Sequence, residues 1–180
     1  SAAPGATVDV QISIKGNPGI LGARLSVALD DGLTLVGASN GDAFSVLTMT
    51  KPGKLVSPCQ FVWDGQDITN EDIKDGVILT LTFAVAPDAV SGVTQNIHIS
   101  YKYGDFVDAN LKKLVIDMVD GGVAVADYVP GDTNKDQEVT PADIIMLRRY
   151  LAGGYDLDIS VAAGDVNADE ELTPVDVILI

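Results

Sequence analysis

The chain has 180 residues with 26 acidic and 11 basic side chains, which gives a formal net charge of -15. Hydrophobic residues make up 47% and aromatic residues 6%, which predicts one large or two small globular domains with aliphatic cores. The acidity argues against nucleic acids and anionic membrane surfaces as partners, because both require clustered Lys and Arg. No apolar run reaches the roughly 18 residues of a membrane-spanning helix, so no membrane insertion is expected.

Apolar and polar residues alternate with a period of two in several short runs of the first 127 residues. Gly, Pro, Asn and Asp separate these runs, as is typical of β-strands joined by turns. The pattern predicts a mainly β fold, a jelly-roll sandwich of about eight or nine strands. The clearest runs are 8–14, 23–29, 77–85, 96–101 and 122–126.

Single residues of the β region give no sign of catalysis. His98 is the only histidine and lies in an alternating run, so we interpret it as a sheet residue and expect no Ser-His-Asp set. Trp63 with Tyr101 or Tyr103 could stack on a sugar ring, but packing in the core or at sheet edges is favoured. Cys59 is the only cysteine and is expected to be an inert apolar residue.

Residues 131–180 carry 11 acidic and 3 basic side chains, and they contain an internal repeat. Residues 131–147 align with residues 164–180 at an offset of 33, with identity at 9 of 17 positions. The shared positions are mostly oxygen donors. This charge density would repel itself unless a cation neutralised it, so a metal is expected here.

Each copy of the repeat spaces its side-chain oxygens as a 12-residue EF-hand-type calcium loop does, at positions 1, 3, 5 and 12, with the carbonyl of position 7 as a further donor. All donors are oxygen and several are flexible carboxylates, which favours calcium over magnesium. Two calcium ions are therefore predicted. The expected ligands are Asp132, Asn134, Asp136, Glu138 and Asp143 in the first loop, and Asp165, Asn167, Asp169, Glu171 and Asp176 in the second.

A short helix is predicted after each loop, with Thr140 as N-cap, Pro141 as first residue and Asp143 near the positive helix end. Three features differ from a sensor EF-hand. Position 6 holds Gln137 or Glu170 in place of the usual Gly, so a side chain is expected in a strained backbone conformation. Position 12 is Asp rather than Glu, and no helix enters the first loop.

The tandem loop–helix repeat over residues 131–180 resembles the dockerin module of cellulosomes, which also has Asp at position 12. The resemblance implies that positions 10 and 11 of each loop, and basic residues on the following helix, contact a partner cohesin. Ile180 aligns with Leu147, so the second repeat is expected to be truncated. The residues implied to bind the partner are Pro141, Ala142, Arg148, Arg149, Pro174 and Val175.

Residues 1–127 are similar to a cohesin, the receptor of dockerins. The similarity rests on turn and core stretches at 17–20, 33–36, 40–44, 75–83 and 104–105. Cohesins bind dockerins on a flat sheet face. The positions on that face that the resemblance implies are Gly22, Arg24 and Asp64, and Arg24 stands where an acidic residue is common, which would alter the charge preference.

Taken together, the two resemblances imply a cohesin-like sandwich at 1–127, a short linker at 128–130 and a dockerin at 131–180. The implied function is a non-catalytic scaffoldin adaptor of polysaccharide degradation, secreted or at the bacterial cell surface. Its sandwich would bind the dockerin of an enzyme or scaffold, and its dockerin another scaffold's cohesin. Weak carbohydrate contact stays open, as does an alternative: an X-type or carbohydrate-binding accessory module joined to a glycoside hydrolase's dockerin.

Overall fold

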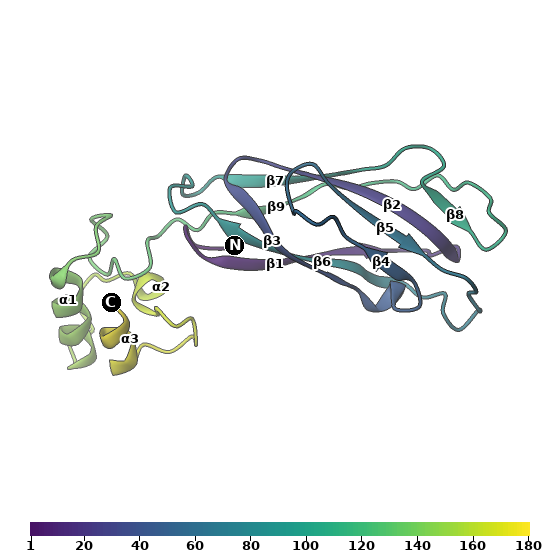
Figure 1. The fold of residues 1–180 in the computed structure, drawn as a ribbon. Coiled ribbons are helices and arrows are strands. Elements are labelled where there is room, and N and C mark those ends of the chain that lie inside the picture. Colours follow the sequence, from purple (N-terminus) through teal and green to yellow (C-terminus); the bar gives the residue numbers. More distant parts are fainter.

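The computed structural model describes residues 1–180, and its larger part is a sandwich of two antiparallel sheets (Figure 1). The smaller sheet has the order β1-β6-β3, and the larger has the order β4-β5-β2-β7-β9 with β8 paired to β2. The strands are β1 (Thr7–Ile14), β2 (Ile20–Leu29), β3 (Leu33–Asn40), β4 (Thr48–Thr50), β5 (Cys59–Asp64), β6 (Gly76–Val85), β7 (Thr94–Ser100), β8 (Phe106–Asp108) and β9 (Gly121–Ala124), with a 3-10 helix η1 (Asp42–Phe44) after β3.

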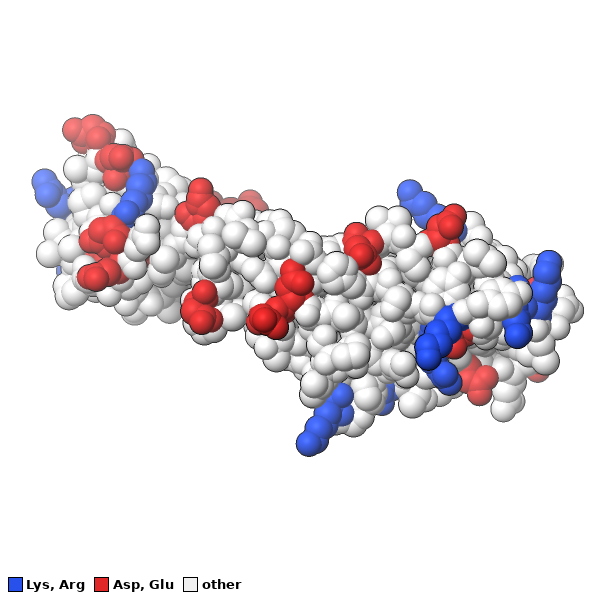
Figure 2. All heavy atoms as spheres, turned by 90° about the horizontal axis from the view of Figure 1, so that it is seen from above, with Lys and Arg blue, Asp and Glu red and all other residues white.

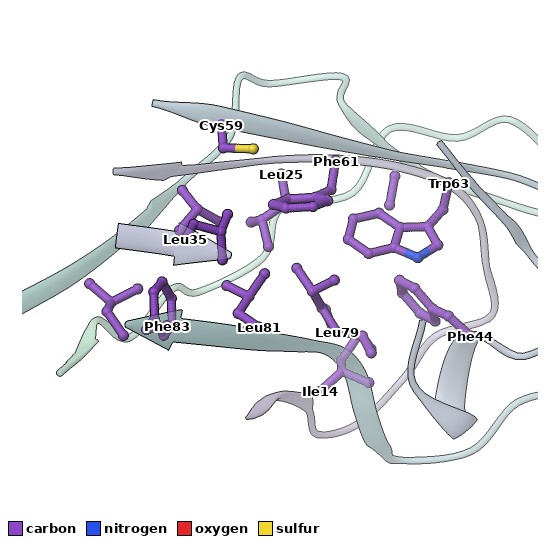
Figure 3. Packing of buried hydrophobic residues seen from close by; sticks show 14 of the residues in the cluster. Ile14, Leu25, Leu35, Phe44, Cys59, Phe61, Trp63, Leu79, Leu81 and Phe83 are labelled. Atoms are coloured by element: carbon purple, nitrogen blue, oxygen red, sulfur yellow. The ribbon is translucent and has the colours of Figure 1, made fainter. Parts of the chain in front are cut away.

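The mainly β sandwich predicted from the alternation is confirmed. In β6, the residues at alternate positions point into the space between the sheets, and Leu79, Leu81 and Phe83 are fully buried there. Leu25 and Phe61 face them from the larger sheet (Figure 3). The core is therefore built by period-two burial on two facing sheets, as expected for a sandwich.

Trp63 lies in this core and not on a sugar-binding surface. Its side chain is 1% exposed and meets Phe44 edge-to-face at 5.6 Å between ring centroids (Figure 3). Its indole N–H donates a 2.7 Å hydrogen bond to Asn40 Oδ1. Tyr101 packs against Phe106, so of the aromatic residues considered from sequence only Tyr103 is exposed. The core-packing interpretation therefore holds for Trp63.

The C-terminal part is a small helical body beside one end of the sandwich (Figure 1). It contains α1 (Pro141–Leu151), α2 (Val161–Gly164) and α3 (Pro174–Leu179). Leu147 and Ala163 are fully buried between these elements. None of the helices is long and apolar enough to cross a bilayer.

Candidate calcium loops and interaction surfaces

The two oxygen-rich loops have nearly the same hydrogen bonds. Asp132 at position 1 accepts from the backbone N–H of Asp136 at 3.1 Å and of Gln137 at 2.8 Å. In the second loop Asp165 accepts from the equivalent residues 169 and 170 at 3.1 and 2.9 Å. The first carboxylate of each loop therefore holds the following five residues in a tight turn, which brings positions 1, 3 and 5 to the inside of one bend.

The position-12 aspartates are buried and serve as helix caps. Asp143 is fully buried and accepts from the backbone N–H groups of Thr133, Asn134 and Thr140. Burial raises its pKa, but these donors together outweigh burial and hold the pKa below the ordinary value. Asp176 has the same arrangement in the second loop, with its pKa also lowered. Both side chains are thus kept ionised.

The donor chemistry of the loops fits calcium. Each loop offers three carboxylates, an amide oxygen and a backbone carbonyl, which are the hard oxygen ligands that calcium prefers. The carboxylates do not converge as a ligand set in this structure. In the first loop the Asn134 amide donates to Asp136 at 2.7 Å, and both Asp143 oxygens accept backbone N–H groups. The geometry shown is a loop closed by its own hydrogen bonds.

The non-glycine residues at position 6 take the left-handed conformation expected from the sequence. Gln137 has φ 71° and Glu170 has φ 67°. Position 4 is left-handed too, at Lys135 and Ala168, which the sequence interpretation missed. Such a conformation costs a side-chain-bearing residue about 1 to 2 kcal/mol.

Glycine at position 6 is therefore expected to stabilise the helical body. Replacing Gln137 and Glu170 by Gly removes the Cβ strain, and we expect about 1 kcal/mol per site after the entropy cost of glycine. Thermal unfolding in calcium measures the gain. Glu138→Gly is the matched control, because Glu138 has no left-handed backbone and glycine there brings only the entropy cost. Equal effects of Gln137→Gly and Glu138→Gly would contradict the argument.

The helix residues predicted to bind a partner are all exposed. Pro141 and Ala142 begin α1, Arg148 and Arg149 lie near its end, and the second repeat exposes its equivalents at the start of α3. The structure adds a pair that the sequence interpretation missed. Ile145 is 58% exposed and its repeat equivalent Ile178 is 82% exposed. Each lies four residues after the helix proline, so each helix presents an apolar residue on the proline's face. The exposed equivalents in the second repeat are Pro174 and Val175.

The sheet residues predicted to bind a partner share the outer face of the larger sheet. Gly22 of β2 lies directly opposite Asp64 of β5, so the two positions point the same way. Arg24 is two residues further along β2, its side chain is about half exposed, and its guanidinium lies 3.9 Å from Asp105. The register thus brings together three positions that are far apart in sequence.

This outer face is polar and carries no aromatic side chain across its three central strands. The buried residues alternate with the face residues along β2, β5 and β7. Viewed from above the sheet, Lys and Arg gather mainly toward the end that is distant from the helices (Figure 2). The face consists of Gly22, Arg24, Ser26 and Ala28 on β2, Gln60, Val62 and Asp64 on β5, and Asn96, His98 and Ser100 on β7.

His98 lies on this face between two aspartates, as a surface sheet residue. Its Nδ1 is 2.8 Å from Asp120 and its Nε2 is 4.0 Å from Asp30. The hydrogen bond to Asp120, reinforced by the charges of Asp120 and Asp30, raises the pKa of His98 above 6.5 despite desolvation.

Sandwich stability is therefore expected to decrease as pH rises above 6.5. A raised folded-state pKa means that protonated His98 contributes fully below pH 6.5, and that this contribution disappears as pH rises through the folded pKa. Denaturant unfolding between pH 5 and 9 measures the decrease. His98→Gln should flatten the profile over that range, and an unchanged profile in this variant would assign the decrease to another group.

Residues 130–180 match the family model of the dockerin type I domain. Several solved structures of cohesins have a similar fold. One is the sixth cohesin of scaffoldin B from Acetivibrio cellulolyticus, solved with a mutant Cel5 dockerin (TM-score 0.58, 22% identity, 68% of this chain and 91% of that chain covered). Another is a type III cohesin of a cell-surface anchoring scaffoldin from Ruminococcus flavefaciens (0.55, 20%, 69% and 79%).

The likeness extends beyond cellulosomes. A non-cellulosomal cohesin from the archaeon Archaeoglobus fulgidus matches with a TM-score of 0.54 at 12% identity, covering 67% of this chain and 81% of that chain. No curated protein matches the sequence. The chain therefore combines a dockerin region with a cohesin-like fold. Such modules are non-catalytic interaction modules, typically of extracellular cellulosomes, and dockerin type I domains generally bind calcium.

Proposed function

We propose that the chain is a non-catalytic adaptor that joins two partners in a cellulosome-type assembly. Residues 1–127 would form the receptor module. Residues 131–180 would form the calcium-dependent module that binds a receptor on another protein, and residues 128–130 would be the linker. The observation that carries the proposal is the coexistence, in one chain, of a repeated oxygen-rich loop–helix unit and a polar sheet face without aromatic side chains, formed by β2, β5 and β7. The setting we propose is the outside of a bacterial cell.

In the helical body we propose one calcium ion per loop, two in all. Asp132, Asn134, Asp136 and Asp143 would hold the first ion with the carbonyl of Glu138. The second would be held by the equivalent residues 165, 167, 169, 176 and 171. The caps described above place Asp143 at the start of α1, so an ion there would also fix the direction of that helix.

The partner of the helical body would be a cohesin. Pro141 and Ile145 form one exposed face on α1, with Arg148 and Arg149 about one turn after Ile145. A compact apolar strip beside two guanidinium groups suits a sheet face that carries small apolar and acidic residues. The second repeat offers Pro174, Val175 and Ile178 in the same way.

The partner of the sandwich would be a dockerin. The outer face of β2, β5 and β7 lacks the row of exposed aromatics that stacks on sugars, which supports protein rather than polysaccharide as its main ligand. Arg24 is paired only with Asp105, at 3.9 Å. Its charge favours a dockerin that brings carboxylates to this position.

Binding to panels of immobilised cohesins and dockerins, with calcium and with a chelator, tests the proposal. We expect capture by a cohesin in calcium only, and capture by a dockerin that persists in Arg149→Ala but weakens in Arg24→Asp. Ile145→Asp should weaken cohesin capture alone. Binding to cellulose or xylan without capture of either partner would favour the accessory-module alternative, and hydrolysis of a polysaccharide by the purified chain would exclude the adaptor role.

A further inference from the structure

The imidazole of His98 and two carboxylates meet on the outer face of the larger sheet because the strand register brings them together. His98 of β7 lies opposite Ala28 of β2, and Asp30 follows two residues after Ala28. On its other side β7 pairs with β9, which begins at Gly121, so Asp120 just before it lies opposite His98. Side chains at opposite and diagonal positions on one face of a sheet are within reach of each other.

Asp120 fixes the direction and the tautomer of the imidazole. Its Oδ2 lies 2.8 Å from Nδ1 of His98, and its Oδ1 accepts the backbone N–H of Ile99 at 2.8 Å. A carboxylate at Nδ1 favours the neutral tautomer in which Nδ1 carries the proton and Nε2 keeps its lone pair. Histidines that bind metals almost always donate their other ring N–H to such an acceptor. Nε2 of His98 is therefore oriented as that of a metal ligand.

Asp30 presents one free carboxylate oxygen to this nitrogen. Its Oδ2 accepts the backbone N–H and the side-chain amide of Asn96, both at 2.8 Å. These hydrogen bonds, the backbone one foremost, hold the pKa of Asp30 below its ordinary value, so the carboxylate is ionised. Its Oδ1 lies 4.0 Å from Nε2 of His98. The two atoms face each other with no hydrogen bond between them.

The separation of these two atoms suits a divalent transition metal ion. At 4.0 Å they are too far apart for a hydrogen bond, but they are separated by about twice the zinc–ligand distance of roughly 2.0 to 2.2 Å. A tetrahedral angle at zinc requires an approach to about 3.4 Å, and the two side chains are 54% and 38% exposed, so they can close this difference. Imidazole and carboxylate donors together suit zinc, copper or nickel, whereas calcium prefers oxygen alone.

We propose that Nε2 of His98 and Oδ1 of Asp30 bind one divalent transition metal ion, with Asp120 as a positioning residue that holds the imidazole without touching the ion. No group of three His, Cys, Asp or Glu side chains converges on one point here, so water fills the remaining positions. The ion takes the place of a proton on Nε2, and binding releases that proton when His98 is protonated. The site uses no donor of the calcium loops and does not rest on the adaptor role.

Zinc titrated into the full chain in excess calcium is the probe, followed by the nitrogen resonances of the imidazole ring. His98 is the only histidine, so these resonances report this side chain alone. We expect a saturable shift of Nε2, with amide shifts of the sandwich confined to residues 28–30, 96–100 and 120. His98→Gln should lose these amide shifts. A ring spectrum that zinc leaves unchanged, or the same amide shifts in His98→Gln, would overturn the proposal.

Variants of equal size separate ligation from general attraction of a cation. Asp30→Asn keeps an acceptor for Asn96 but puts an amide nitrogen in place of the free oxygen, so the zinc affinity should fall more than about tenfold. Asp31→Asn removes the same charge from the adjacent exposed residue and should bind zinc as the natural chain does. Equal losses of affinity in these two variants would mean that zinc is held only by the local negative charge, and the inference would be wrong.

Asp120→Asn tests the positioning role. Its amide keeps an oxygen for the N–H of Ile99 and donates to Nδ1 of His98, which moves the ring proton to Nε2 and removes the lone pair that binds the ion. The zinc affinity should fall about 10- to 100-fold, and the ring of the zinc-free variant should show the other tautomer. The amide spectrum recorded in the same titration reports that the variant is folded. Unchanged zinc affinity in a folded Asp120→Asn variant would contradict the role of Asp120.

Discussion

Replacing Asp132 and Asp165 together by Ala is expected to abolish calcium uptake and leave the helical body unfolded. Each side chain is the first donor of its loop and also holds two backbone N–H groups. Changes in the outer shell of a metal site already weaken binding 10- to 100-fold, so loss of a direct ligand should exceed about 100-fold. Because a preformed site rarely survives unfolding, lost binding free energy becomes lost folding free energy.

Calorimetric titration of metal-stripped protein checks this, with far-ultraviolet circular dichroism for the helices. The natural chain should take up two equivalents and gain helix signal, and the double variant neither. Asp156→Ala removes an exposed acidic residue of the same body outside both loops and should behave as the natural chain. Uptake of two equivalents by the double variant would mean that the ions bind elsewhere. If the natural chain took up no calcium, the repeats would be only turns followed by capped helices, without a metal-binding role.

Trp63→Ala is expected to destabilise the sandwich by about 3 to 5 kcal/mol, the usual cost of emptying a large aromatic site. The indole is fully enclosed between the sheets, meets Phe44 edge-to-face and pairs with Asn40. Its removal leaves a cavity and also an Asn40 oxygen without its donor. Because net folding stability is only about 5 to 15 kcal/mol, this single change removes a large part of it.

Urea unfolding in calcium measures the effect, followed by a spectroscopic signal that reports the folding of the sandwich. Trp63→Phe keeps most of the apolar volume and loses the hydrogen bond, so its cost should be smaller, about 1 to 3 kcal/mol. Tyr103→Ala is the matched surface control, since that ring is exposed, and should change stability by less than about 1 kcal/mol. A Trp63→Ala variant of natural stability that had lost sugar binding would instead favour the stacking role.

The strands that alternate most regularly could be located closely from sequence. The run at 8–14 corresponds to β1 (Thr7–Ile14), and 77–85 to β6 (Gly76–Val85), because both faces of these strands have constant environments. The short β4 and β8 were not among the clearest runs, since three residues are too few for a period to show. The 3-10 helix η1 and the four-residue α2 were missed for the same reason.

Some features of the candidate sites could likewise be predicted from sequence, and others could not. Donor spacing is a local property, so the calcium loops and the capped helices could be inferred from the repeat alone. The solvent exposure of a side chain, by contrast, depends on tertiary packing. That Ile145 and Ile178 face solvent is decided by how α1 and α3 pack, although their equivalent places in the repeat, four residues after a helix proline, were a usable signal.

The two repeats are joined to each other by backbone hydrogen bonds. Gly131 N–H donates to Ala163 at 2.7 Å, and Ser160 N–H donates to Thr133 at 2.9 Å, so the start of the first loop is tied to α2 and its N-cap, just before the second loop. Ordering one loop therefore orders part of the framework of the second. Such coupling predicts cooperativity: filling should be steeper than for two separate sites, so the body would switch between assembled and released over a narrow range of ion concentration.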